Sequence, residues 1–150
     1  MANLAQIEKY LKSKKLPYKI IDLGEEVYTV KGVKDAGIDE DEIVKTLIVR
    51  TGKQFVALAI RGKDRIDFKK VRKLFGSKSE LAKPDEVMKI CKVPVGAVCP
   101  ILLNIPIYID RRVMDLTRVH LGSGDLTRGL EMELADLLAA AGKYQVVDLV

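Results

Sequence analysis

The chain has 150 residues, of which 48% are hydrophobic and 31% charged, a balance that is typical of one folded globular domain and excludes a disordered chain. The formal net charge of +5 permits a polyanionic partner, but aromatic residues make up only 5% and tryptophan is absent, which disfavours binding of single strands by base stacking. No apolar run reaches the ~18 residues of a membrane helix and residues 1–15 have no signal-peptide core, so we expect a cytoplasmic protein without a membrane partner.

In chain order, the apolar pattern predicts an irregular mixture of helices and strands. The first helix should run from Leu4 to Lys14, because Asn3 and Gln6 can cap it and Pro17 ends it. The clearest element is a hairpin, in which two apolar strands flank the turn at Thr51–Lys53. The elements expected are helix 4–14, strand 18–22, helix 30–37, an acidic turn at 39–42, strands 43–50 and 54–61, a helix between Asp67 and Gly76, a helix beginning at Pro84, strand 106–110, strand 130–134, helix 135–141 and strand 144–149.

This arrangement predicts the class of fold. Helices and strands alternate without a regular βαβ order, and the tight hairpin must be antiparallel. We therefore expect a single α+β domain over residues 1–150, with helices packed around a curved mixed β-sheet.

The cysteines and the histidine exclude several chemistries. The chain holds only Cys91, Cys99 and His120, whereas a structural zinc site needs four such ligands, so no metal site is expected. Both cysteines are interpreted as reduced residues of the core or of a loop. A Ser-His-Asp triad would depend on His120, and no nucleophile-elbow motif supports it. In its β-rich segment, His120 is interpreted as a structural histidine with satisfied hydrogen bonds.

Lys45 is the first candidate for chemistry, because it lies inside the most apolar strand, on the face of Ile43 and Leu47. Lysine is depleted in strands and is rarely fully buried. One interpretation is an edge-strand lysine that reaches water or pairs with a carboxylate, and strand position alone favours it. The other is a cation in a cleft, which would hold a phosphate or polarise a carbonyl.

Two glycine-containing segments are further candidates. In Gly96–Pro100, glycine allows close approach of a ligand to the backbone, and exposed N–H groups could bind a carbonyl oxygen, although such segments are more often turns. The loop Gly122–Asp125 could line a pocket or only make a turn, and it does not form a dinucleotide-binding motif. Ser123 is interpreted as a turn hydroxyl.

Residues 61–80 carry eight basic and three acidic side chains. A solvated helix face and a surface that contacts a phosphate backbone are both compatible with this composition.

Taken together and in this order, these segments resemble the YbaK/EbsC family of aminoacyl-tRNA deacylases, the free-standing relatives of the editing domain of bacterial prolyl-tRNA synthetase. The match covers nearly the whole chain. The segments that carry it are DEIVKTLIV at 41–49, RIDFKKV at 65–71, SELA at 79–82, PDEV at 84–87, GAVCP at 96–100, IYID at 107–110, GSG at 122–124 and RGLEMEL at 128–134.

The resemblance implies a trans-editing hydrolase that deacylates mischarged aminoacyl-tRNA, with Cys- or Ala-tRNA(Pro) as expected substrates and no metal or cofactor. It implies that Lys45 is catalytic and engages the acceptor end and the ester, while the Gly96–Pro100 loop holds the carbonyl. Thr46 after the lysine is nearer to the cysteine-specific type, because the alanine-specific type has Asn there. The substrate-binding residues that the resemblance implies are Tyr28, Thr29, Thr46, Gly96, Ala97, Val98, Cys99, Pro100, Gly122, Ser123 and Gly124.

Two other classes of function stay open on the sequence. A non-catalytic module that binds tRNA or a synthetase could use the same fold. A plain interaction protein, in which Lys45 is structural, is the third hypothesis. The expected partners are the acceptor end of a mischarged tRNA and, as a further candidate, a synthetase.

Overall fold

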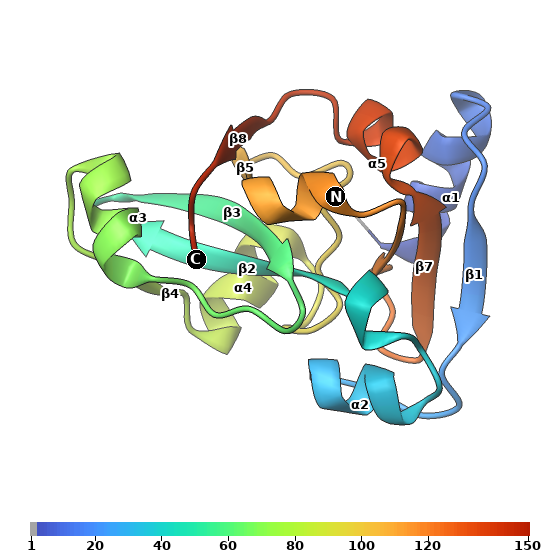
Figure 1. Cartoon of the computed structure of the whole chain (residues 1–150). Coiled ribbons are helices and arrows are strands. Elements are labelled where there is room, and N and C mark those ends of the chain that lie inside the picture. Colours follow the sequence, from blue (N-terminus) through green and yellow to red (C-terminus); the bar gives the residue numbers. More distant parts are fainter. Residues whose placement is uncertain (1–2) are drawn as a thin grey trace.

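The computed structural model describes residues 3–150, so the first two residues of the expected 1–150 domain and of the segment 1–15 lie outside it (Figure 1). Its larger sheet has five strands in the order β4-β2-β3-β5-β8. The expected hairpin forms the centre of this sheet, and Thr51 pairs with Gln54 across a two-residue turn. The β3–β5 and β5–β8 pairs are parallel and the other pairs antiparallel, so the sheet is mixed as expected. The strands are β2 (Val44–Thr51), β3 (Gln54–Arg61), β4 (Ser79–Leu81), β5 (Ile107–Asp110) and β8 (Gln145–Val147).

A second sheet has three antiparallel strands in the order β1-β7-β6. Its strands are β1 (Lys19–Asp22), β6 (Arg118–Gly122) and β7 (Arg128–Glu133). Within residues 3–150, the two sheets are joined by a single parallel bridge between Ile43 and His120. Figure 1 shows β1 and β7 running across the direction of β2 and β3, so β2 and β6 diverge after this bridge. The α+β class and the mixed strand pairing are therefore confirmed, and the strands form two sheets where one curved mixed sheet was expected.

Helices surround the sheets and begin where the sequence provides caps. The side chains of Asn3 and Gln6 form the expected capping box of α1, and Asp67 caps α3 by accepting a hydrogen bond from the backbone N–H of Lys69. Gly76 ends α3 with a left-handed backbone at φ +67°. The helices are α1 (Leu4–Ser13), α2 (Val30–Asp35), α3 (Phe68–Phe75), α4 (Pro84–Cys91) and α5 (Leu134–Ala141), with 3-10 turns η1 (Glu40–Glu42) and η2 (Arg111–Asp115). None of these described helices is long or apolar enough to cross a membrane.

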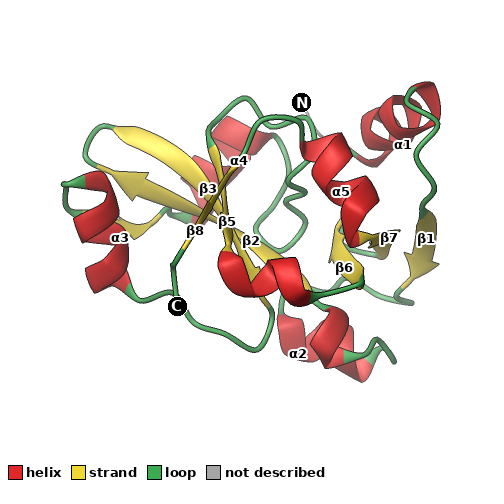
Figure 2. Ribbon diagram, turned by 45° about the horizontal axis from the view of Figure 1, so that its top comes forward, coloured by secondary structure: helices red, strands yellow, loops and turns green. Residues whose placement is uncertain are grey.

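Two apolar cores hold the elements together. The larger core joins both sheets to α1, α4 and α5, and includes the fully buried Ile7, Leu11 and Leu130. The smaller core lies under α3, where Val71 packs with Leu58 and residues of the C-terminal segment. Figures 1 and 2 show α2 and α3 at opposite ends of the β2–β3 hairpin. The hairpin thus has one end packed by α3 and another end facing α2 and the second sheet.

Candidate functional site

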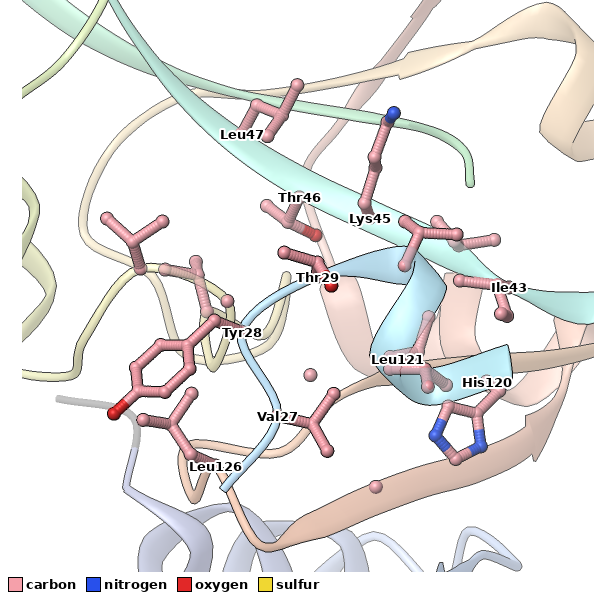
Figure 3. Close-up of a pocket in the computed structure, with 18 of the residues that line it drawn as sticks. Val27, Tyr28, Thr29, Ile43, Lys45, Thr46, Leu47, His120, Leu121 and Leu126 are labelled. Atoms are coloured by element: carbon pink, nitrogen blue, oxygen red, sulfur yellow. The ribbon is translucent and has the colours of Figure 1, made fainter. Parts of the chain in front are cut away.

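A cavity of about 440 Å³ opens beside the first half of β2 (Figure 3). Its walls come from the segment 27–33 that includes α2, from β2, from residues 81–82, from the loop at 95–98, and from β6 with the loop that leads to β7. Most of the lining side chains are apolar, among them Val27, Leu121 and Leu126. A concave, mainly apolar pocket with a few polar groups is the usual form of a ligand site.

The pocket exists because the outer edge of β2 is only partly paired. Strand β4 pairs with β2 from Val49 to Thr51, and the Ala82 N–H donates to the Ile48 carbonyl at 2.9 Å. At the other end, Ile43 bridges to β6. The edge between these points is open, so side chains from both faces of β2 line the cavity. Figure 3 shows Lys45 and Thr46 leaving the strand on opposite sides.

Lys45 lies half-buried in the wall of this pocket. Its Nζ donates to the Gly62 carbonyl at 3.2 Å, and it has no ion-pair partner within residues 3–150. Burial lowers the pKa of Lys45; the carboxylate of Asp64 acts in the opposite direction, and Arg65 in the same direction. An ammonium has three N–H donors, so two remain for a ligand.

Tyr28 and Thr29 form the wall opposite β2. Tyr28 is 54% exposed, and its hydroxyl donates to Glu26 at 2.6 Å. Thr29 is the N-cap of α2, because its Oγ1 accepts a hydrogen bond from the Gly32 N–H at 3.1 Å. Both line the pocket, so their predicted part in substrate binding is compatible with their positions.

The Gly96–Pro100 segment packs against the Tyr28 backbone. Gly96 has a left-handed backbone with φ +92°, and a Cβ there would lie 2.7 Å from the Tyr28 carbonyl oxygen, so only glycine fits without strain. Gly96 and Val98 line the pocket, whereas Ala97, Cys99 and Pro100 are buried behind its wall.

In the loop Gly122–Asp125, too, only some of the residues line the pocket. Gly122 lines the pocket, and a Cβ there would overlap the backbone of Ala97 and Val98. Ser123 is fully buried, and its hydroxyl bonds to the Arg128 carbonyl at 2.7 Å, which confirms the interpretation as a turn hydroxyl. The Gly124 N–H donates to the Ala97 carbonyl at 2.7 Å, away from the pocket. The role of Ser123 and Gly124 in substrate binding stays a prediction.

His120 is a pocket residue that the sequence did not indicate. It is 3% exposed, lines the cavity, and its Nδ1 has no hydrogen-bond partner in the described protein, so the expectation of a satisfied structural histidine is wrong. Its ring lies so close to Gly129 that a Cβ there would overlap it. Burial lowers the pKa of His120, against the carboxylates of Glu131 and Glu42, so the imidazole is neutral at pH 7. A single histidine in an alternating strand pattern does not indicate that its side chain will be buried in the wall of a pocket.

The other candidates lie outside the pocket. Cys91 and Cys99 are free and buried, as expected, and burial raises the pKa of Cys99 to about 12, which keeps it a thiol. The part of the chain that is described contains no group of three or more His, Cys, Asp or Glu side chains placed to hold a metal. In the basic segment 61–80, Lys69, Lys70, Arg72, Lys73 and Lys78 lie in α3 or after it, at the far end of the hairpin from α2 (Figure 2), whereas Arg61, Lys63 and Arg65 lie at the end of β3 and after it, beside the Gly62 carbonyl that Lys45 contacts. The contact of this segment with a phosphate backbone stays a prediction.

A family model and the curated relatives indicate the family of this chain. A family model described as the aminoacyl-tRNA editing domain matches residues 24–140. A proline–tRNA ligase of Macrococcus caseolyticus is 37% identical over 89 residues, which are 58% of this chain and 16% of the ligase. The chain thus spans about a sixth of the length of this curated relative.

Solved structures match the fold over nearly the whole chain. A crystal structure of a hypothetical protein has a TM-score of 0.85 and 30% identity, covering 96% of this chain and 98% of that one. Another, described as a candidate trans-editing enzyme for prolyl tRNA synthetase, has a TM-score of 0.83 and 26% identity, covering 97% and 95%. Because the editing-domain model covers most of the chain and the fold agrees throughout, the chain belongs to the aminoacyl-tRNA editing domain family.

Proposed function

We propose that this protein is a trans-editing hydrolase that cleaves the ester of a mischarged aminoacyl-tRNA, with a tRNA for proline carrying cysteine or alanine as the expected substrate. The single observation that carries the proposal is the Lys45 ammonium, half-buried without an ion-pair partner in the described chain, in the wall of an apolar pocket. Residues 1–150 act in this proposal as one editing domain.

The charges around the pocket suit the acceptor end of a tRNA. Lys31 of α2 and Arg128 at the start of β7 line it together with Lys45, and none of the three has an ion-pair partner within the described residues. One carboxylate, Asp125, lies among the lining residues. An excess of unpaired cations favours contacts with phosphate groups, and such contacts do not depend on the base sequence.

The ester carbonyl is assigned to the wall between Lys45 and the Gly96–Pro100 loop. Among the described residues, the backbone N–H groups of Gly96 and Val98 donate to no protein acceptor, so both are available as donors. When water attacks the carbonyl carbon, negative charge grows on the carbonyl oxygen, and donors aimed there stabilise the transition state. The bond to the ribose oxygen then breaks, and that oxygen takes a proton to restore the tRNA hydroxyl. A separate pocket of this kind supplies discrimination that a synthetase lacks between similar small side chains.

The test is a panel of Cys-, Ala- and Ser-tRNA(Pro), in which loss of the ester is followed with the parent protein, Lys45→Met and Arg50→Met. Arg50 is the matched control because it lies in the same strand, exposed and paired with Glu80. We expect the parent to hydrolyse at least one member, Lys45→Met to be about 100-fold slower or worse, and Arg50→Met to be unchanged.

Thermal unfolding of each variant shows whether the fold survives. A parent protein that binds these tRNAs without hydrolysing any of them would instead be a non-catalytic binding module, and Lys45 would then be a phosphate contact. A parent that neither hydrolyses nor binds them would contradict both hypotheses.

A further inference from the structure

Thr46 carries a buried hydroxyl that nothing in the protein satisfies. Within residues 3–150, only two buried side-chain polar atoms have no hydrogen-bond partner, Thr46 Oγ1 and His120 Nδ1, and both residues line the same pocket. Leaving a buried polar group unpaired is costly, so native proteins contain few such groups, and they are concentrated at sites with a role in binding or chemistry. Both unpaired atoms therefore belong to the wall of one cavity, where a bound ligand can reach them.

The backbone of Thr46 is open as well. Because Thr51 pairs with Gln54 across a two-residue turn, the odd-numbered residues of β2 exchange hydrogen bonds with β3. The even-numbered residues turn their N–H and C=O groups to the other edge, as the bond from Ala82 to the Ile48 carbonyl shows. The N–H and C=O of Thr46 face the same edge and, in the described chain, have no backbone partner.

The surroundings of Thr46 are otherwise apolar or already paired. In Figure 3, its hydroxyl lies on the side of the strand where Thr29 and Val27 lie. The Oγ1 of Thr29 accepts the Gly32 N–H in capping α2 and forms no hydrogen bond with Thr46. Val27, Leu121 and Leu126 offer no hydrogen bond. Thr46 is therefore an isolated polar residue within an apolar wall, and it follows Lys45 in the chain.

We propose that Thr46 Oγ1 recognises a hydrogen-bonding group on the side chain of the aminoacyl ester, so that the pocket selects small side chains with a hydroxyl or a thiol over alanine. This inference rests on the proposed function and names the substrate class of that site. Position supports it, because Thr46 and Lys45 line the same pocket from opposite faces of β2, and the Thr46 hydroxyl lies on the side of Val27, where the wall is apolar and suits an amino-acid side chain. The open carbonyl of Thr46 is the matching acceptor for the α-ammonium group of the same substrate.

His120 does not share this contact. It bridges to Ile43, three residues before Thr46, which places the two residues about 10 Å apart along β2. One small side chain cannot bond to both. Thr46 is the nearer of the two to Lys45, and for this reason the inference is assigned to Thr46 alone.

The experiment compares kcat/KM for Ser-tRNA(Pro) and Ala-tRNA(Pro) in the parent, Thr46→Val and Thr46→Ser. Valine keeps the shape and removes the hydroxyl, whereas serine keeps the hydroxyl. We expect the parent to prefer the seryl ester. The ratio of kcat/KM for the seryl ester to kcat/KM for the alanyl ester should fall about ten- to a hundredfold in Thr46→Val and be retained in Thr46→Ser. Thr51→Val is the matched control, because the Thr51 hydroxyl lies in the same strand and already bonds to Ser79 at 2.8 Å. It should leave the ratio unchanged.

The outcomes separate this inference from the proposed function. A parent that hydrolyses neither ester contradicts the proposed function itself. A parent that hydrolyses both at equal rates, or a Thr46→Val variant that keeps the seryl preference, overturns the role of Thr46 and leaves the hydrolase in place.

Discussion

The two halves of β2 differ in how their polar groups are paired. In the second half, the Thr51 hydroxyl bonds to Ser79, and Arg50 forms ion pairs with Glu80 and Glu86. In the first half, Lys45 has a single bond to a backbone carbonyl, and the Thr46 hydroxyl has no partner in the described chain. The same strand therefore has a closed half beside β4 and an open half beside the pocket.

Because of this difference, the open half should contribute less to stability than the closed half. Unsatisfied polar groups near a cavity weaken a fold, and a purely structural strand would have covered its edge. Both halves pair with β3, but β4 covers the outer edge of the closed half, while within residues 3–150 the outer edge of the open half is paired only at its two ends, by the Ile43–His120 bridge and by Ala82. Under the proposed function the open half binds substrate, so substitutions in the two halves should have separable effects on activity and stability.

The largest separation is expected between Leu58 and Leu47, which face each other across β3 and β2. Leu58 is fully buried in the core under α3, so Leu58→Ala should lower the free energy of unfolding by about 2–5 kcal/mol. Leu47 is only partly buried and lines the pocket, so Leu47→Ala should cost less stability and more activity. Urea denaturation and deacylation rates measure the two effects. Equal destabilisation with unchanged activity for Leu47→Ala would mean that Leu47 serves the core and not the pocket.

Two glycines with left-handed backbones provide a second comparison. At Gly76, φ is +67° and an added Cβ meets open space, so Gly76→Ala should cost about 1 kcal/mol of stability and no activity. At Gly96, φ is +92° and the Cβ would lie 2.7 Å from the Tyr28 carbonyl oxygen, so Gly96→Ala must also move the pocket wall. We expect a loss of about tenfold or more in kcat/KM for Gly96→Ala. An active Gly96→Ala variant with only the stability loss of Gly76→Ala would show that this wall does not position substrate.

Local signals in the sequence were sufficient for most elements and for part of the site. The cap at Asn3, the turn before Gln54 and the glycine at 76 act through their immediate neighbours, so their elements lie within a few residues of the predicted ones. Strand β4 was missed because Ser79–Leu81 has one apolar residue and is formed by pairing with β2. The division into two sheets also depends on a long-range contact, between Ile43 and His120.

For the site, motif order indicated the segments and not the orientation of each side chain. Gly96 and Val98 line the pocket, whereas Cys99 is buried behind it, although all three belong to one motif. The open state of Thr46 depends on where β4 stops, which no local pattern of β2 contains. His120 was missed for the same reason, because its burial comes from packing between the two sheets.

His120 gives a smaller effect, which depends on pH. Burial lowers its pKa in the folded protein, so the unfolded chain takes up the proton first as the pH falls. Stability should therefore decrease as the pH drops below about 6.5, the ordinary pKa of histidine. His120→Gln, which cannot titrate, should show a shallower loss of Tm between pH 7 and pH 5. Parallel Tm curves for the parent and the variant would mean that His120 is protonated in the fold without penalty.

The smallest effect is expected at the closed half, from the ion pair between Arg50 and Glu80. Both side chains are exposed, and the guanidinium lowers the pKa of Glu80 mainly through its hydrogen bond. Exposed ion pairs contribute little, because water screens the charges and ordering two long side chains costs entropy. Arg50→Met should change Tm by about 2 °C or less at low salt, and by still less at 1 M salt, as thermal unfolding would measure. A larger loss that persists in salt would mean that Arg50 holds β4 and α4 in place through packing of its stem, and the closed half would then depend on Arg50 as well as on the Thr51–Ser79 hydrogen bond.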